Sequence, residues 1–133
     1  MKVRNGFVSN SSSSSFVVLK DALTEKQQDM ILDYQEWIKF FLALDSEDEN
    51  LINKFSYYDS DPWRIQVYDD FIFGETSMDN FSMNDYLDYI KVNNDYIEWD
   101  EGYNDEPYPA QLAFILRKKQ EYRKKKLDKL NNV

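Results

Sequence analysis

The chain lacks cysteine and histidine altogether, and it has only three glycines and three prolines among 133 residues. Without cysteine it can form neither disulfides nor a reactive thiolate, so nothing indicates secretion and a reducing compartment is expected. Without histidine, imidazole-based triads, histidine-ligated zinc and histidine acid–base catalysis at neutral pH are excluded. The scarcity of glycine and proline predicts mostly regular secondary structure with few tight turns.

Long apolar runs are also missing, since none approaches the roughly 20 residues that cross a bilayer. We therefore expect no membrane association. The first fifteen residues, MKVRNGFVSNSSSSS, carry charge but no apolar core, so they are not expected to act as a signal peptide. A chain of this length can bury a core without disulfides or metals. We expect one domain over residues 1–133, with 117–133 as a charged helical tail.

What the chain does have is aromatic residues, 17% of the total, and an uneven distribution of charge. Residues 45–106 hold 18 acidic residues against three basic ones, a net charge of −15. Residues 107–133 hold eight basic residues against two acidic ones, a net charge of +6. The middle of the chain should therefore repel nucleic acid and attract basic partners, and the tail should do the opposite.

The longest amphipathic stretch covers residues 24–44. Thr24 and Gln27 have the spacing of a capping box, in which two side chains satisfy backbone N–H groups of the first helical turn. The large apolar residues recur at steps of three and four, which predicts one long helix with a single buried face. These residues are Met30, Ile31, Tyr34, Trp37, Ile38, Phe41 and Leu42.

Four short segments have the pattern of β-strands: residues 16–20, 63–68, 71–76 and 96–99. The second and third are separated only by Asp69 and Asp70, which predicts a β-hairpin. We therefore expect an α+β fold, with a small, mainly antiparallel sheet of about four strands and the long helix packed on one face. A mixed sheet is the alternative, and the order of the strands stays open.

Two further helices are expected. Ser82 with Asp85 has the pattern of a helix start, followed by an apolar face of Met83, Tyr86, Leu87 and Ile90. Pro109 suits the first position of a C-terminal helix. Residues 110–116 of that helix are nearly all apolar and are expected to be buried. Residues 117–132 are highly charged, and we expect them to project from the body or to lie along it.

The least ordinary stretch is RNGFVSNSSSSSF, from Arg4 to Phe16. A run of five serines is usually a flexible linker, but this one has apolar residues on both sides, which favours a turn and strand. The stretch resembles the opening of small uncharacterised proteins of tailed bacteriophages and some bacteria. GETSMDNFSMNDYLDYI, at residues 74–90, resembles a second block of some of these proteins. The resemblance spans about a quarter of the chain and implies a phage-type origin, hence the cytoplasm of a bacterial host, but no catalytic residues.

Adjacent carboxylates are plentiful, but none has the spacing of a calcium loop, and 25 acidic residues make chance pairs common. We interpret them as solvated surface and expect no catalytic residue, metal or cofactor. A second interpretation concerns aromatic rings mixed with acids, because rings supply contact area and acids steer basic partners. The candidate protein-binding residues are Asp59, Asp61, Tyr103, Asp105, Glu106 and Tyr108. For the two tyrosines, closure over the core is an equal alternative.

The sequence thus favours a non-enzymatic phage accessory protein that binds a host protein with a basic surface. Mimicry of DNA, to inhibit a host DNA-binding enzyme, is one alternative, because the acidic middle of the chain has few intervening bases. A minor virion or assembly protein is another, and a metal-dependent carboxylate enzyme is a third. The basic tail predicts self-association through the C-terminal helix, and direct binding of nucleic acid is not expected.

Overall fold

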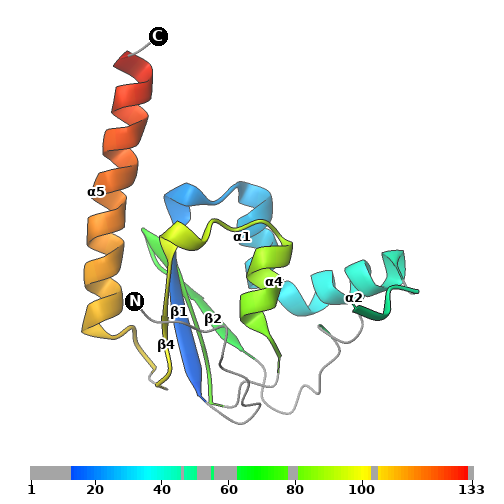
Figure 1. Cartoon of the computed structure of the whole chain (residues 1–133). Coiled ribbons are helices and arrows are strands. Elements are labelled where there is room, and N and C mark those ends of the chain that lie inside the picture. Colours follow the sequence, from blue (N-terminus) through cyan, green and yellow to red (C-terminus); the bar gives the residue numbers. More distant parts are fainter. Residues whose placement is uncertain are drawn as a thin grey trace.

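In a computed structural model, the structure describes residues 13–45, 47–50, 55, 63–77, 81–102 and 105–131. Helices and strands are interspersed along these residues (Figure 1). In chain order they are β1 (Ser14–Leu19), the 3-10 helix η1 (Lys20–Ala22), α1 (Glu25–Leu32), α2 (Tyr34–Leu44), β2 (Arg64–Val67), β3 (Phe71–Thr76), α4 (Met83–Tyr89), the 3-10 helix η2 (Asn94–Tyr96), β4 (Ile97–Asp100) and α5 (Pro109–Asn131).

The strands form a four-stranded sheet in the order β2-β3-β1-β4, and each neighbouring pair is antiparallel. All four predicted strands are therefore confirmed, with bounds that differ by up to two residues, and so is the α+β class. The hairpin is confirmed as well, because the Tyr68 amide donates to the Phe71 carbonyl across the turn, at 2.9 Å. The mixed sheet that the sequence left open does not occur among these strands.

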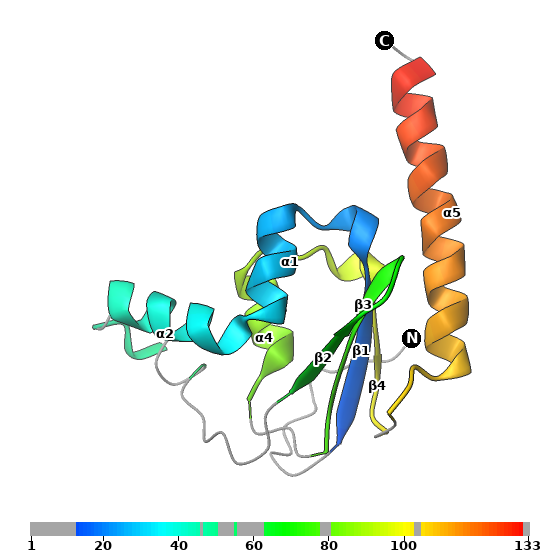
Figure 2. The same cartoon turned by 180° about the vertical axis from the view of Figure 1, so that it is seen from behind.

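Strand β1 lies in the middle of the sheet and is buried throughout. Its side chains alternate between two apolar clusters, so Phe16 and Val18 face one layer while Val17 and Leu19 face the other. Helices α1 and α4 cover the first face, and α5 covers the second (Figure 2). This three-layer arrangement explains why residues 16–19 are an unbroken apolar run, since a strand covered on both faces has no solvent side.

The prediction of one continuous helix over residues 24–44 is wrong. The capping box of Thr24 and Gln27 is present and starts α1, but the helix ends at Asp33, whose φ of −113° and ψ of 41° are not helical. A second helix, α2, begins at Tyr34 and extends away from the sheet (Figure 1). The periodicity of apolar residues continued through Asp33 and gave no sign of the break, because the steps of three and four persist on both sides.

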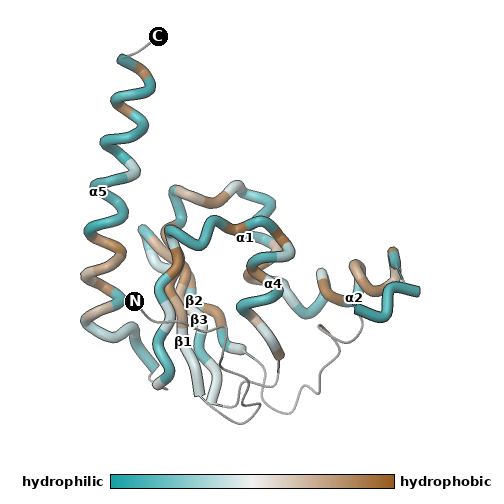
Figure 3. Tube along the Cα trace, in the orientation of Figure 1, coloured by the Kyte–Doolittle hydropathy of each residue, from teal (hydrophilic) through white to brown (hydrophobic). Residues whose placement is uncertain are grey.

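The C-terminal helix begins at Pro109 as expected, but burial of residues 110–116 is only partly confirmed. Gln111, Phe114 and Ile115 are buried, whereas Leu112 and Leu116 are exposed. A helix that packs on one face of a sheet buries a single stripe, so a continuous apolar run cannot be covered all round. Beyond the sheet, α5 projects from the body, and its outer part is mostly hydrophilic (Figure 3).

The serine run reaches into the core. Ser14 and Ser15 are fully buried on β1, and the Ser15 hydroxyl accepts a hydrogen bond from the Gln111 amide of α5, at 3.1 Å. Ser13 lies just before the strand and donates to the Glu101 carbonyl, at 3.2 Å. These three serines are therefore structural, which agrees with the strand interpretation rather than with a flexible linker.

Candidate protein-binding surface

Helix α2 carries a group of large apolar side chains that the core covers only in part. We call it the α2 aromatic surface, and it consists of Trp37, Phe40, Phe41 and Leu44 from α2 and Tyr89 from α4. Phe40, Leu44 and Tyr89 are 51%, 68% and 43% exposed. Exposed apolar side chains that adjoin one another, rather than scatter singly, are typical of interaction sites.

The rings of this surface contact one another. Trp37 and Phe40 pack edge to face with centroids 5.6 Å apart, and Phe40 lies 5.9 Å from Phe41. Phe41 in turn packs edge to face on Tyr89, at 5.1 Å, which joins α2 to α4. Ring pairs in this geometry stabilise each other beyond the area that they bury, so the surface is held in shape.

The base of α2 is fixed in the core, which positions the aromatic surface. Tyr34 and Ile38 are buried, and the Tyr34 hydroxyl accepts a hydrogen bond from the Trp63 amide, at 2.8 Å. The Trp63 indole N–H donates to the Phe81 carbonyl, at 3.1 Å. The first turns of α2 are thus bonded to the start of β2, and the turns that follow carry the exposed rings away from the body.

Acidic residues lie next to the α2 aromatic surface on both of its helices. Residues 29–50 contain seven acidic residues and one lysine. The Trp37 indole N–H donates to the Asp29 carboxylate, at 3.1 Å, and Glu36 precedes Phe40 by one helical turn. Tyr89 is flanked in the same way by Asp85, one turn earlier on α4, and by the exposed Asp88. The surface therefore combines apolar contact area with negative charge.

Two lysines lie close to these groups. The Lys26 ammonium is 5.9 Å from the centre of the Trp37 ring, and Lys39 pairs with Glu36 at 3.2 Å. Both side chains are exposed, and exposed ion pairs contribute little to stability. The lysines already show how cations engage this surface, one over an aromatic face and one beside a carboxylate.

Three of the six residues that were predicted from the sequence as a binding surface are described by the structure, and none of these three belongs to the α2 aromatic surface. Asp59, Asp61 and Tyr103 lie outside the described residues. Asp105 and Glu106 are exposed in the segment that leads from β4 to α5. Tyr108 is half-buried, and its hydroxyl lies close to Gly102. A side chain at position 102 would collide with it, since a Cβ there would lie 2.3 Å from the hydroxyl oxygen. Of the three that the structure describes, Asp105 and Glu106 are thus exposed to solvent and Tyr108 is not.

Asp105 also has structural contacts. Its carbonyl accepts a hydrogen bond from the Gln66 amide, at 3.2 Å, and its carboxylate lies 3.8 Å from the Arg64 guanidinium. Arg64 in turn holds the buried carboxylate of Glu75 through two hydrogen bonds, of 2.6 and 3.1 Å. These contacts fasten the segment before α5 to the edge of the sheet.

The α2 aromatic surface was missed because Trp37 and Phe41 were assigned to a fully buried helix face. A signal was nevertheless present in the sequence. Positions 37, 40, 41 and 44 repeat at three, four and seven residues, which makes a second apolar stripe beside the one that contains Tyr34 and Ile38. A helix with two such stripes has more apolar surface than one packing partner covers.

No protein-family model, curated protein or solved structure matches this chain. The resemblance of residues 4–16 and 74–90 to phage proteins therefore stays a prediction. Among the described residues, no group of three or more acidic side chains is arranged to hold a metal ion. No helix in the described ranges is both long enough and apolar enough to cross a membrane.

Proposed function

We propose that this protein acts by binding, not catalysis, and that its partner is a host protein with a basic surface. In this proposal it is an accessory protein of phage type in the cytoplasm of a bacterial host. The contact is the α2 aromatic surface, where exposed rings supply the area and the surrounding acids attract a basic partner. The single observation that carries the proposal is the exposure of Phe40 and Leu44 beside acidic neighbours.

Charge and apolar area have separate roles in such an interface. Acids at the rim, such as the exposed Asp88, accelerate encounter with a basic protein and make the association rate sensitive to salt. Rings at the centre, such as Phe40, determine how long the complex lasts, because they lose their water on binding. The partner should therefore carry a basic rim around an apolar depression or helix face.

The test compares the unaltered protein with the double variant Phe40→Ser/Leu44→Ser. Each is immobilised and used to capture proteins from a bacterial lysate, and a protein enriched by the unaltered chain is then purified for calorimetry. We expect the double variant to weaken its binding at least about tenfold, as substitution of central residues does in interfaces. Raising the NaCl concentration should slow association without abolishing the complex.

The matched control is Leu112→Ser/Leu116→Ser, which removes two exposed apolar side chains from α5, on the opposite face of the sheet. Circular dichroism verifies that both double variants keep the helix content of the unaltered protein. Equal loss of the partner by both double variants would show that capture depends on nonspecific hydrophobic contacts. Unchanged binding by the α2 variant would contradict the proposal.

The same experiments separate the alternatives that the sequence left open. A captured DNA-binding enzyme that duplex DNA displaces would favour mimicry of DNA. Two acids of the acidic middle segment are engaged within the chain, Glu75 by Arg64 and Asp70 by Lys119, at 2.6 and 2.8 Å, and are not available for a phosphate-like array. Detection of the protein in purified phage particles by mass spectrometry would favour a virion or assembly role.

A further inference from the structure

A pocket lies where α5 passes beyond the sheet, on the opposite side of the molecule from the α2 aromatic surface. We call it the α5 pocket, and its volume is about 400 Å³. That volume lies within the range of small-molecule sites in proteins, about 300–1,000 Å³. It is lined by Tyr96, Tyr122, Lys125, Lys126, Lys129 and Leu130. All but Tyr96 come from α5.

The apolar part of the pocket is formed by two tyrosine rings and a leucine. Tyr96 is buried at the end of η2, and the Tyr122 ring packs edge to face on it with centroids 5.7 Å apart. Tyr96 is held further by Lys118, whose ammonium lies 5.9 Å from the centre of the ring. A rigid pair of aromatic rings favours a ligand with a planar ring of its own.

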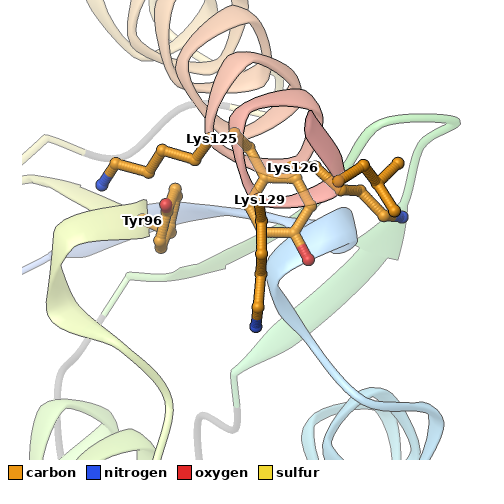
Figure 4. Close-up of a pocket in the computed structure, with 6 residues that line it drawn as sticks. Tyr96, Lys125, Lys126 and Lys129 are labelled. Atoms are coloured by element: carbon orange, nitrogen blue, oxygen red, sulfur yellow. The ribbon is translucent and has the colours of Figure 1, made fainter. Parts of the chain in front are cut away.

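The charged part of the pocket is formed by three lysines within two turns of α5. Lys125 and Lys129 are four residues apart and Lys126 and Lys129 three apart, so Lys129 follows each of the other two by about one helical turn. Figure 4 shows the side chains of Lys125 and Lys129 extending from the helix on either side of the Tyr96 ring. Like charges at this spacing destabilise a helix, and a bound anion would relieve their repulsion.

Within the part of the chain that the structure describes, the basic residues of α5 that lie nearer the body have carboxylate partners, unlike the three pocket lysines. Lys118 and Arg117 both pair with Glu121, and Lys119 pairs with Asp70 at 2.8 Å. Among the described residues, none of the three pocket lysines has a carboxylate partner. Carboxylates thus pair with the basic residues in the first half of α5, and three of the basic residues in its second half lie around the two aromatic rings.

We propose that the α5 pocket binds a small organic anion with a planar aromatic group, such as an aryl phosphate. The ring of the ligand packs on Tyr96 and Tyr122, and its phosphate or carboxylate lies between the lysines. Neither part alone accounts for the pocket, because a simple anion makes no use of the half-buried Tyr122 ring and a neutral ring leaves the lysines without a counter-charge. This inference is independent of the proposed function and concerns a different face of the molecule.

A single strand of nucleic acid also combines bases with phosphates, but the acidic residues of the body oppose a polyanion more strongly than a small ligand. The pocket contains one buried ring, Tyr96, whereas strand-binding proteins place successive rings along a groove. The observations therefore favour a single small anion.

The test titrates the full chain with naphthyl phosphate and follows backbone amide signals by NMR, together with binding by calorimetry. We expect shifts confined to residues around Tyr96 and from Tyr122 to Leu130. Inorganic phosphate and naphthol, which each supply half of the ligand, should bind at least about tenfold more weakly, a difference of about 1.4 kcal/mol. A short thymidine oligonucleotide is titrated in parallel.

The double variant Lys125→Gln/Lys129→Gln keeps both tyrosines and should weaken binding of naphthyl phosphate about fivefold, as expected for two exposed charge contacts. The control is Lys124→Gln, a lysine of the same helix that does not line the pocket, and it should leave the affinity unchanged. Equal effects of the two variants would overturn the proposal. So would equal affinities for naphthyl phosphate and inorganic phosphate, or tighter binding of the oligonucleotide at the same residues.

Discussion

Gly74 on β3 has no side chain, and this leaves room for the ring of Phe16 on the neighbouring strand β1. A Cβ at this position would come within 2.3 and 2.8 Å of two atoms of the Phe16 ring, its partner across the strand pair, and 3.1 Å from Ile65. Phe16 cannot move aside, because its ring packs on Trp63 and Trp99, with centroids 5.7 and 5.2 Å away. Glycine normally weakens a strand, and the close approach of the Phe16 ring explains why glycine is nevertheless present at position 74.

Gly74→Ala should therefore lower the free energy of unfolding by about 1–3 kcal/mol, the usual cost of overpacking a core. Urea denaturation measures it. The control is Gly102→Ala, where the added carbon meets the hydroxyl end of the half-buried Tyr108, which can shift. A Gly74→Ala loss no greater than that of the control would show that the sheet accommodates the methyl group.

Tyr86 is fully buried, and the ionisation of its hydroxyl group is suppressed. It donates a hydrogen bond to the Met30 carbonyl, at 2.7 Å, and thereby joins α4 to α1. Burial raises the pKa of Tyr86 well above its ordinary value, and the negative charges of Asp29 and Asp33 raise it further. The folded protein thus holds this proton more tightly than the unfolded chain does. The resulting stability is complete below the unfolded pKa and is lost as the pH rises through it toward the folded pKa.

Stability should accordingly fall above about pH 10, by up to about 1.4 kcal/mol per pH unit from this group. Tyr86→Phe should cost about 1 kcal/mol at neutral pH, because the Met30 carbonyl loses its donor. The same variant should reduce the alkaline loss. Urea denaturation across the alkaline range compares the two proteins, and parallel pH profiles would rule out a contribution from Tyr86.

At the scale of secondary-structure elements, α5 is joined to the sheet by a buried polar contact as well as by apolar packing. The Gln111 amide donates to the Ser15 hydroxyl on β1, and its carbonyl oxygen accepts from the Tyr108 backbone amide, at 2.9 Å. Both side chains are fully buried. The contact fixes the first turn of α5 at one end of the central strand, and Phe114 and Ile115 then pack on the sheet.

A double-mutant cycle with Ser15→Ala and Gln111→Leu measures this contact. Each single change should cost about 1–3 kcal/mol, because it leaves a buried polar group without its partner. The double variant should cost less than the sum of the two, by at least about 0.5 kcal/mol. Strictly additive losses in urea denaturation would mean that the hydrogen bond contributes nothing beyond the packing of the two side chains.

At the scale of the whole molecule, charge is separated between an acidic body and a basic projecting helix. The pairs Lys119–Asp70 and Lys118–Glu121 use some of this charge within the chain. Residues 123–131 are exposed throughout, and five of the nine are basic. Such a helix can contact the acidic body of a second copy, and the self-association predicted from the sequence would then be electrostatic and weakened by salt.

Deletion of residues 123–133 should reduce self-association in sedimentation measurements while leaving the sheet intact, because Phe114, Ile115 and Tyr122 remain in place. High NaCl should have the same effect on the full chain. An unchanged distribution of species after truncation would contradict the prediction. If the truncated protein instead gained salt-sensitive affinity for a DNA-binding protein, mimicry of DNA would become the better interpretation.

Local patterns predicted most of the elements. The capping box of Thr24 and Gln27 starts α1, and the Ser82 hydroxyl accepts from the Asp85 amide at the start of α4. The alternation and length of the apolar segments predicted the strands, because a strand's two faces are visible in its own residues. The candidate binding surface was less predictable, since Asp105 and Glu106 are exposed but Tyr108 contacts Gly102.

The fold class, the hairpin, the starts of α1, α4 and α5 and the separation of charge could all be predicted from the sequence, because each of these depends on residues close together in the chain. Two features became visible in the folded chain alone: α2 turns away at Asp33 and exposes Phe40, and Tyr96 packs on Tyr122 beside three lysines. These features depend on contacts between distant segments, such as the hydrogen bond from Trp63 to Tyr34 and the packing of Phe41 on Tyr89. Periodicity shows which side chains are apolar, but which of them become covered depends on where the neighbouring elements lie.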